Sequence, residues 1–489
     1  MVTLHTNREE YWNDLCEILR AYLGMVEIEA VPAWEDAKGY ALSVILSKEG
    51  AYQAVAQGQK DGVSFTASIP VKANSNDPPL LIKRQEKRAM KIALFRALRE
   101  LEPDVPLPWG SLTGIRPTKL LRELTEDFGE QEALRIFSEE FDVMPQKAAL
   151  AAKTTEVQRP ILKSVRPDSV SLYIGVPYCR TRCMYCSFPS VVSGDRGVPD
   201  AYFDALLQEI SLSAAIIKDA GFHVRSTYVG GGTPTVLSAD QLTRLLEHTG
   251  NCYGGFGMEL TVEAGRPDSL NEEKLRALHA AGAGRISLNP QTMQPETLKR
   301  IGREHTPEEL IAIYRLAREI GFQSINMDVI AGLPGEGASE FLDTLQQIEA
   351  LGPDNLTVHT LAIKRSSRLK ERIEAYPLPG AAEAERMVEF GMEYAQSMGM
   401  RPYYMYRQKY MRGNLENVGY AVPGRECVYN VDMMEEAVSV MAHGAGSMTK
   451  RVFAGRDLRV ERLPAPKDIV TYLNKLSAFM ENKKALFCG

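Results

Sequence analysis

Residues 170–186, VSLYIGVPYCRTRCMYC, join an apolar run to a loop that carries three cysteines. The first seven residues of this stretch are nearly all apolar, which is typical of a strand buried on both faces. The loop that follows places Cys179, Cys183 and Cys186 within eight residues. The stretch therefore predicts a buried strand whose carboxyl end presents three thiols.

Five more short runs of this kind follow along the chain, separated by segments with helical spacing of apolar residues. The predicted strands are residues 170–176, 224–229, 258–263, 285–289, 324–330 and 355–361. The predicted helices are residues 200–219, 238–250, 271–282, 295–301, 307–320 and 338–351. Such alternation predicts an α/β fold with a parallel sheet, either a partial (β/α)6 barrel or a doubly wound open sheet.

Unusual residues stand where these strands end. GGGTP at 230–234 follows the second strand, Glu263 ends the third, and NPQ at 289–291 follows the fourth. Asp328 lies in the fifth strand, and the sixth leads to Ala362. Because active sites of barrels lie at the carboxyl ends of the strands, we expect one site to gather these residues.

The spacing Cys179-x3-Cys183-x2-Cys186 lets three thiolates reach one metal centre from a single loop. A structural zinc site needs a fourth nearby Cys or His, and none lies between Cys186 and His223. Three ligands with an open fourth position favour a [4Fe–4S] cluster. Zinc binding, or three cysteines without a ligand role, are the alternatives.

The other strand-end residues each have a functional and a structural interpretation. The glycine run 230–234 approaches a ligand closely or forms a tight turn. Glu263 holds an ammonium or ribose hydroxyls, or it is paired within the core. Arg303 and Asp328 bind a carboxylate and a ribose, or form an ordinary ion pair, and Gln291 bonds to a ligand or to a turn. The tyrosines at 403–420, which lie among basic residues, form a wall for a flat anionic ligand or a packed β region.

The remainder of the chain predicts further segments around this core. A helix at 8–24, strands at 39–48 and 62–72, and a helix at 82–101 predict a small α/β domain, and the proline-rich residues 102–110 indicate its boundary. We expect an N-terminal α/β domain at residues 1–103 and a helical connector at 104–166. The barrel core is expected at 167–370, and a small C-terminal α/β extension on the substrate side at 371–489.

The composition excludes several classes of protein. The 489 residues are 44% hydrophobic and 25% charged with a net charge of −6, which argues against a nucleic-acid partner. The sequence begins without a cationic segment followed by an apolar one, so secretion is not expected. It contains no apolar stretch of about 18 residues, so a membrane span is not expected either. Seven cysteines in so long a chain predict free thiols and a cytoplasmic protein.

The three-cysteine motif resembles that of the radical S-adenosylmethionine (SAM) superfamily. Further stretches, in this order, resemble the oxygen-independent coproporphyrinogen III oxidase family: LYIGVPYC at 172–179, YVGGGTPT at 228–235, TVEA at 261–264, AGAGRISLNPQT at 281–292, IGREHT at 301–306 and NMDVIAGLPG at 326–335. The resemblance covers residues 168–450. Residues 355–369 and 403–421, with the long N-terminal extension, are similar to the coproporphyrinogen dehydrogenase branch.

The resemblance implies that Cys179, Cys183 and Cys186 bind a [4Fe–4S] cluster, with SAM on the fourth iron. Five positions match family contacts to this SAM: Tyr173, Tyr185, Gly231, Glu263 and Met448. Tyr173 is also assigned to catalysis. The family has a second SAM site, and its positions match Gly232, Thr233, Gln291, Arg303, Asp328 and Ala362.

Two departures from the family pattern bear on function. Decarboxylating members often carry a fourth cysteine where this chain has Phe188, and a haem-chaperone branch lacks that cysteine too. The usual GVQ is Asn289-Pro290-Gln291, which is expected to reshape the second SAM site. The substrate-side segment of longer members has no clear match, so the candidate partners for substrate carboxylates are Lys364, Arg365, Arg401, Arg407, Lys409 and Arg412.

The implied activity is that of a radical SAM oxidoreductase in porphyrin and haem biosynthesis. A 5′-deoxyadenosyl radical would convert coproporphyrinogen III to protoporphyrinogen IX by oxidative decarboxylation. The alternatives are a haem chaperone that retains the cluster and another radical enzyme acting on tetrapyrroles. The expected partners are a tetrapyrrole substrate and a small electron-transfer protein that serves as reductant.

Overall fold

The computed structural model describes residues 1–489 except 25, 37–38, 75, 115, 365, 372–375, 410 and 454–458. The chain forms two compact units. The first contains Met1–Ala152 and Arg407–Leu415, and the second contains Lys153–Tyr406 and Glu416–Gly489. Among the described residues, none of the helices has the length and apolar character needed to cross a bilayer.

The first unit contains a five-stranded sheet with the order β2-β1-β3-β4-β5, in which β1 is parallel to both its neighbours and the other pairs are antiparallel. The strands are β1 (Val2–Thr6), β2 (Ile28–Ala30), β3 (Ala41–Ser47), β4 (Gln53–Lys60) and β5 (Val63–Pro70). The helices are α1 (Trp12–Leu23), α2 (Pro79–Leu101), α3 (Pro117–Phe128), α4 (Glu130–Arg135) and the beginning of α5 (Pro145–Lys163).

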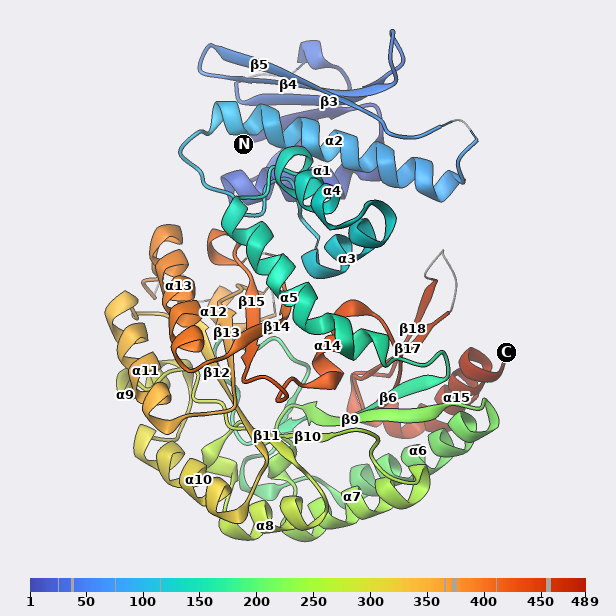
Figure 1. Ribbon diagram of the computed structural model, residues 1–489, viewed down its shortest axis with the longest axis vertical. Coiled ribbons are helices and arrows are strands. Elements are labelled where there is room, and N and C mark those ends of the chain that lie inside the picture. Colours follow the sequence, from blue (N-terminus) through green and yellow to red (C-terminus); the bar gives the residue numbers. More distant parts are fainter. Residues whose placement is uncertain are drawn as a thin grey trace. The chain divides into compact units, whose positions relative to one another are not determined.

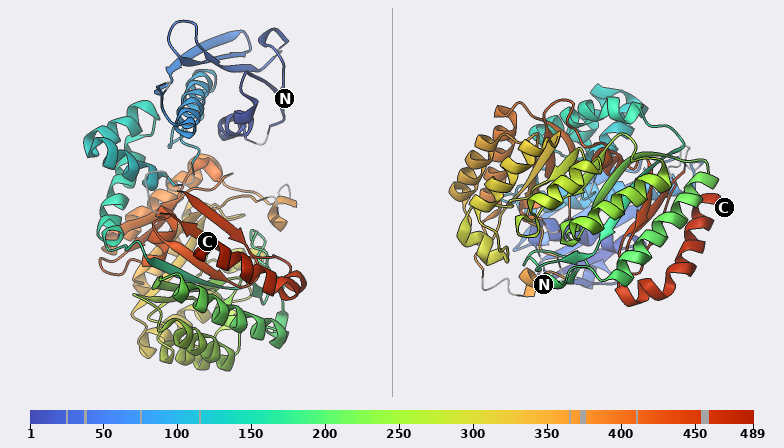
Figure 2. Two further views of the ribbon diagram at one scale, coloured as in Figure 1. Left: turned by 90° about the vertical axis from the view of Figure 1, so that its right-hand side faces the viewer. Right: turned by 90° about the horizontal axis from the view of Figure 1, so that it is seen from below.

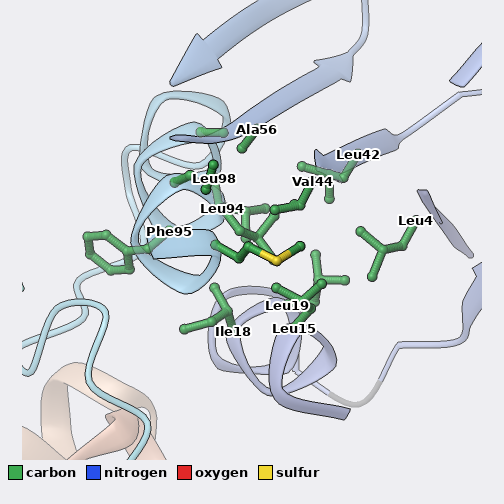
Figure 3. Close-up of a cluster of buried hydrophobic side chains, with 14 of the residues drawn as sticks. Leu4, Leu15, Ile18, Leu19, Leu42, Val44, Ala56, Leu94, Phe95 and Leu98 are labelled. Atoms are coloured by element: carbon green, nitrogen blue, oxygen red, sulfur yellow. The ribbon is translucent and has the colours of Figure 1, made fainter. Parts of the chain in front are cut away.

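The core of the first unit lies between this sheet and helices α1 and α2 (Figure 3). Leu15, Ile18 and Leu19 recur at helical spacing on α1 and are all buried, as the pattern predicts. They meet Leu94 and Leu98 of α2 beneath the strands. The predicted α/β domain is confirmed, although the sequence analysis did not find β1, β2 or β4.

The second unit contains the six predicted parallel strands, side by side in chain order. They are β6 (Ser169–Val176), β9 (His223–Gly231), β10 (Leu260–Glu263), β11 (Arg285–Ser287), β12 (Ser324–Ala331) and β13 (Asn355–Thr360). A doubly wound sheet would reverse its strand order at a switch point, and this order does not reverse. The partial (β/α)6 barrel is therefore the observed fold.

The crossover helices form an arc along one face of this curved sheet (Figure 1). They are α6 (Asp200–Asp219), α7 (Ala239–Tyr253), α8 (Glu272–Ala280), α9 (Pro295–Ile301), α10 (Pro307–Ile320) and α11 (Ala338–Leu351). Reciprocal hydrogen bonds of Ser238 with Gln241, and of Thr306 with Glu309, fix where α7 and α10 begin. Both helices begin within one residue of the starts predicted from their apolar spacing.

The C-terminal residues extend the same sheet at both ends rather than forming a separate body. On the β13 side lie β15 (Asn417–Ala421) and β14 (Arg401–Tyr406), and on the β6 side lie β16 (Ser439–His443), β17 (Met448–Val452) and β18 (Val460–Pro464). The helices of this region are α12 (Arg368–Glu371), α13 (Ala381–Ser397), α14 (Val428–Glu435) and α15 (Ile469–Cys488). The two units therefore do not follow the four expected segments, because strand pairing joins residues on both sides of 370.

A buried ion pair fixes the last helix, α15, to α6, which lies beside it (Figure 2). Lys483 Nζ donates to Glu209 Oε1 over 2.7 Å, and both side chains are fully buried. Glu209 also accepts from the Gly444 N–H and the Tyr472 hydroxyl. The carboxylate therefore connects both helices to the turn after β16.

Replacing Lys483 with Met is expected to lower the free energy of unfolding by about 3 kcal/mol or more, because the buried Glu209 would lose its counter-ion. The double variant K483M/E209Q should recover most of that loss, since it removes the unpaired charge and keeps an acceptor oxygen. The measurement is urea unfolding followed by circular dichroism.

The matched control is Arg276→Ala, which breaks the exposed pair with Glu272 and should cost less than about 1 kcal/mol. A loss in K483M no larger than that in R276A would show that the buried pair does not stabilise this region.

Candidate active site

A cavity of about 350 Å³ lies at the carboxyl ends of the parallel strands. Most of the residues singled out from the sequence line it: Cys179, Cys183, Cys186, Tyr185, Gly231, Gly232, Thr233, Glu263, Arg303 and Asp328. The topology thus brings together residues separated by up to 150 positions, as the strand-end argument predicts.

The cysteine loop is held by bonds to three other parts of the second unit. Met184 donates its N–H to the Ile301 carbonyl (2.9 Å), and Leu369 donates its N–H to the Met184 carbonyl (3.0 Å). Arg266 donates to the carbonyl and the hydroxyl of Thr181 at 3.0 and 2.7 Å. The loop therefore has a defined conformation in the protein alone.

Arg266 also places a buried cation next to the cysteines. Its Nη1 lies 3.7 Å from Cys183 Sγ, while Asp268 accepts from its Nε and Nη2 at 3.0 and 2.7 Å. A guanidinium at this position favours thiolate ligands and the negative charge of a thiolate-bound cluster. Sequence analysis missed Arg266, although it follows the strand-ending Glu263 by only three residues.

The three thiols lie near enough to affect one another. Burial raises the pKa of Cys186, and the negative charges of Cys183 and Cys179 raise it further. In the described part of the chain, no three Cys, His, Asp or Glu side chains converge closely enough to hold a single metal ion. In a cluster each thiolate binds a different iron, so its ligands are spaced more widely than those of one ion. The donor set and its cationic neighbour fit a cluster.

Two glycines bring the end of β9 against the cysteine loop. A Cβ at Gly232 would lie 2.5 Å from the Tyr178 carbonyl oxygen and 3.0 Å from Cys179 Sγ, and Gly231 has a φ of +109°. The N–H of Gly232 donates to the Val176 carbonyl and that of Thr233 to the Tyr178 carbonyl. These two amides are therefore bonded within the protein, and the glycines allow the end of β9 to pack closely against the cysteine loop.

Among the described residues, Glu263 forms no ion pair with a cationic side chain. The Tyr228 hydroxyl donates to its Oε1 over 2.7 Å, and Gly231 supplies a backbone hydrogen bond. Burial raises the pKa of Glu263 to about 7, and the negative charge of Asp328 adds to the effect. A cationic ligand such as an ammonium would relieve this cost, which makes Glu263 a fitting site for one.

A stack of three tyrosines supports Glu263 from within the barrel. The rings of Tyr173, Tyr228 and Tyr429 are nearly parallel, with centroids 4.7 to 6.3 Å apart. Tyr173 and Tyr228 are register partners on β6 and β9, and Tyr429 comes from α14. Tyr173 does not line the cavity, so it positions Tyr228, which sequence analysis missed.

Asp328 and Arg303 supply opposite charges in the cavity wall. Asn326 donates to Asp328 Oδ1 (2.7 Å), and His359 Nε2 lies 3.5 Å from its Oδ2. Burial by itself would raise the pKa of Asp328, but His359 and Asn326 lower it below the usual range. Arg303 donates to the Gly265 and Asn289 carbonyls at 2.9 and 2.8 Å.

Several buried polar atoms of cavity-lining residues have no hydrogen-bond partner in the described part of the chain, among them Arg303 Nε and Asn289 Oδ1. Such atoms are costly unless a ligand or water satisfies them. They mark this side of the cavity as a place where a polar ligand would bind.

Besides Tyr173, three predicted site residues do not reach the cavity. Gln291 has a φ of +67° and uses its backbone to bond Asp328 and Ile330 of β12, while its side chain is buried. Ala362 lies beyond the end of β13 and outside the cavity lining. Met448 begins β17 near the far edge of the sheet and is 44% exposed. The expected contacts of these residues with SAM remain predictions.

The predicted aromatic wall is partly present, whereas the basic residues are not gathered there. Tyr403, Tyr404 and Tyr406 line the cavity. Arg401 pairs through Ala421 with Asn355 at the beginning of β13, so it lies at the opposite edge of the sheet from the site. Among the other basic candidates, Lys364 is half-buried, and Arg365 lies outside the described residues. Arg407, Lys409 and Arg412 belong to the first unit.

Replacing Cys183 with Ala is expected to prevent cluster assembly, because only two thiolates would remain on the loop. After anaerobic reconstitution, bound iron and sulfide should fall from about four of each per chain to well below one. Cys252→Ser, on α7 outside the cavity, is the matched control and should keep the full content. Equal iron and sulfide in both variants would contradict the assignment.

Comparison with known proteins agrees with this geometry. Residues 173–348 match the radical SAM superfamily. The oxygen-independent coproporphyrinogen-III oxidase-like protein HemZ of Bacillus subtilis is 40% identical over 398 residues, which are 80% of this chain and 79% of that protein. The heme chaperone HemW of Escherichia coli is 29% identical over 62% of this chain and 76% of the chaperone.

The oxygen-independent coproporphyrinogen III oxidase of Escherichia coli is 34% identical over 50% of this chain and 48% of the enzyme. A solved structure of coproporphyrinogen III oxidase (HemN) from Escherichia coli matches at a TM-score of 0.52, with 24% identity over 68% of this chain and 74% of that one, which supports the fold. The cysteine loop, the sheet and these similarities show that the chain belongs to the oxygen-independent coproporphyrinogen III oxidase family of the radical SAM superfamily.

Proposed function

We propose that this chain catalyses the oxygen-independent oxidative decarboxylation of coproporphyrinogen III to protoporphyrinogen IX in haem biosynthesis. The observation that supports this most directly is the composition of the cavity at the carboxyl edge of the sheet. Its lining contains three cysteines, the glycines at the end of β9, the carboxylate of Glu263, which suits a cationic ligand, and an aromatic wall. All seven cysteines are free thiols, as a reducing cytoplasm would keep them.

The residues of the cavity divide between two cofactors and a substrate. Cys179, Cys183 and Cys186 would hold a [4Fe–4S] cluster, and Glu263 would accept the ammonium group of SAM. When bound, these cofactors supply radical chemistry that removes a hydrogen atom from a propionate side chain. Arg303 would hold a carboxylate, and Asp328, ionised at neutral pH, would accept hydrogen bonds from ribose hydroxyls.

The tyrosines of β14 form the part of the wall suited to a flat ring. Tyr404 and Tyr406 are stacked at 6.3 Å with an interplanar angle of 11°, and the Tyr406 hydroxyl lies 3.3 Å from His359 Nδ1. Each propionate would lose one hydrogen atom from its β-carbon to the 5′-deoxyadenosyl radical, and then CO2 and one electron, which an external one-electron acceptor would take; a vinyl group would remain. The enclosed wall would exclude water from this step.

A haem chaperone is the second candidate function. Phe188 stands where decarboxylating members often carry a fourth cysteine, and its side chain is 62% exposed at the edge of the cavity. This candidate predicts stoichiometric haem binding without consumption of coproporphyrinogen.

The deciding assay uses the reconstituted, reduced protein with SAM, with and without coproporphyrinogen III, and follows the products by mass spectrometry. We expect 5′-deoxyadenosine together with loss of two CO2 units from the porphyrinogen. SAM cleavage with intact porphyrinogen would refute the proposed reaction, and haem binding would then favour the chaperone.

SAM affinity is expected to depend on pH through Glu263. Because its pKa is about 7 in the protein alone, the carboxylate is half protonated near neutrality and becomes a better ammonium partner as the pH rises. The affinity measured by equilibrium dialysis should therefore increase from pH 6 to pH 8. Glu263→Gln should bind SAM about tenfold or more weakly and lose this increase.

Glu336 provides a matched control. Burial raises its pKa to about 7 as well, but it bonds to Thr292 and does not line the cavity. Glu336→Gln should retain both the affinity and the pH dependence of the natural chain. A pH dependence that survives in E263Q would remove Glu263 from the SAM site.

A further inference from the structure

A second hollow, of about 670 Å³, lies on the other side of the cysteine loop. Arg303 lines both this hollow and the site cavity, and Thr181 and Arg182 of the loop line both as well. The hollow and the site cavity therefore share part of their walls beside the cysteine loop. Nothing in the decarboxylation proposed above uses it.

The hollow is cationic. Arg182, Lys299 and Arg368 contribute to its wall, and within the described part of the chain none of them forms an ion pair with a carboxylate. The carboxylate in the wall is Glu304, which lies 3.9 Å from Arg180. Because the whole chain carries a net charge of −6, this group of cations is a local exception in an acidic protein.

An apolar rim adjoins the cations. Phe188, Val191 and Val192 are 62%, 43% and 42% exposed, and Val192 also lines the hollow. Val192 pairs with Cys179 in a two-residue ladder, so the rim is joined directly to the cysteine loop. Exposed apolar side chains next to unpaired charges are typical of a protein–protein contact.

Two of the cationic residues adjoin the backbone bonds that hold the cysteine loop. Lys299 lies two residues before Ile301, whose carbonyl accepts from the Met184 N–H, and Arg368 lies one residue before Leu369, whose N–H donates to the Met184 carbonyl. The same two bonds that hold the cysteine loop therefore hold the backbone next to both cationic residues.

We propose that this face, defined by Arg182, Lys299, Arg368 and the rim residues Phe188 and Val192, docks an acidic one-electron carrier protein that reduces the cluster. The proposal rests on the proposed function in one respect, namely that the cysteines hold a cluster. The carrier loses one electron and the cluster gains it, and no bond is made or broken. An acidic partner would be attracted to the cations of this face, which favours a fast, salt-sensitive encounter.

The test uses the charge-reversal variant K299E/R368E, the charge-conserving variant K299R/R368K, and K218E/K475E as a matched reversal at exposed lysines of α6 and α15. The probes are two acidic carriers, a flavodoxin and a [2Fe–2S] ferredoxin. Binding to the reconstituted chain is measured by biolayer interferometry at low and high salt. Reduction of the cluster by the reduced carrier is followed by stopped-flow absorbance, with dithionite as the small-molecule reductant.

For the natural chain, K299R/R368K and K218E/K475E we expect binding that weakens as salt is added. K299E/R368E should bind at least tenfold more weakly at low salt and be reduced by the carrier correspondingly more slowly, while dithionite reduces it at the normal rate. Binding by K299E/R368E as tight as that of the natural chain, or no binding of either carrier by the natural chain, would overturn the proposal. Failure of the decarboxylation itself would appear in the product assay and leave these binding measurements unchanged.

Discussion

The parallel pairing of six strands in chain order is the constraint on which the rest of the site depends. It places the carboxyl ends of the strands β6 and β9 to β13 on one edge, and the residues that follow those strands lie there together. The cysteine loop adds one further requirement, which is a fixed conformation. Its bonds to Ile301, Leu369 and Arg266 meet that requirement within the protein chain.

The groups gathered at this edge are unfavourable by themselves. Burial disfavours the ionised form of Glu263, so the stability of the protein alone decreases as the pH rises from the ordinary carboxyl pKa near 4.5 through about 7. The unpartnered atoms of Arg303 and Asn289 add a further cost. Charges and polar atoms that lack partners in the chain are what a site built for a charged ligand is expected to contain.

Much of this could be predicted from the sequence, because the signals are local. Apolar runs identified all six strands, helical spacing of apolar residues identified the helices between them, and the cysteine spacing located the loop. Arg401 shows where the prediction was wrong: it is near tyrosines in sequence, but pairing through β15 makes β14 run parallel to β13 and puts Arg401 at the opposite edge. Tyr228 and Tyr429 were missed because their stacking requires the β6–β9 register and the position of α14, which no local pattern contains. Arg266 was missed because its partners, Thr181 and Cys183, lie more than 80 residues away.

The central claim is that three cysteines on this edge hold a four-iron cluster with one iron left for a ligand that reaches Glu263. Mössbauer spectroscopy of the reconstituted, iron-57-labelled protein, recorded with and without SAM, tests it most directly. We predict that SAM shifts the signal of one iron in four and leaves the other three unchanged, and that E263Q requires more SAM for the same shift. A spectrum in which all four irons are equivalent and insensitive to SAM would contradict the account.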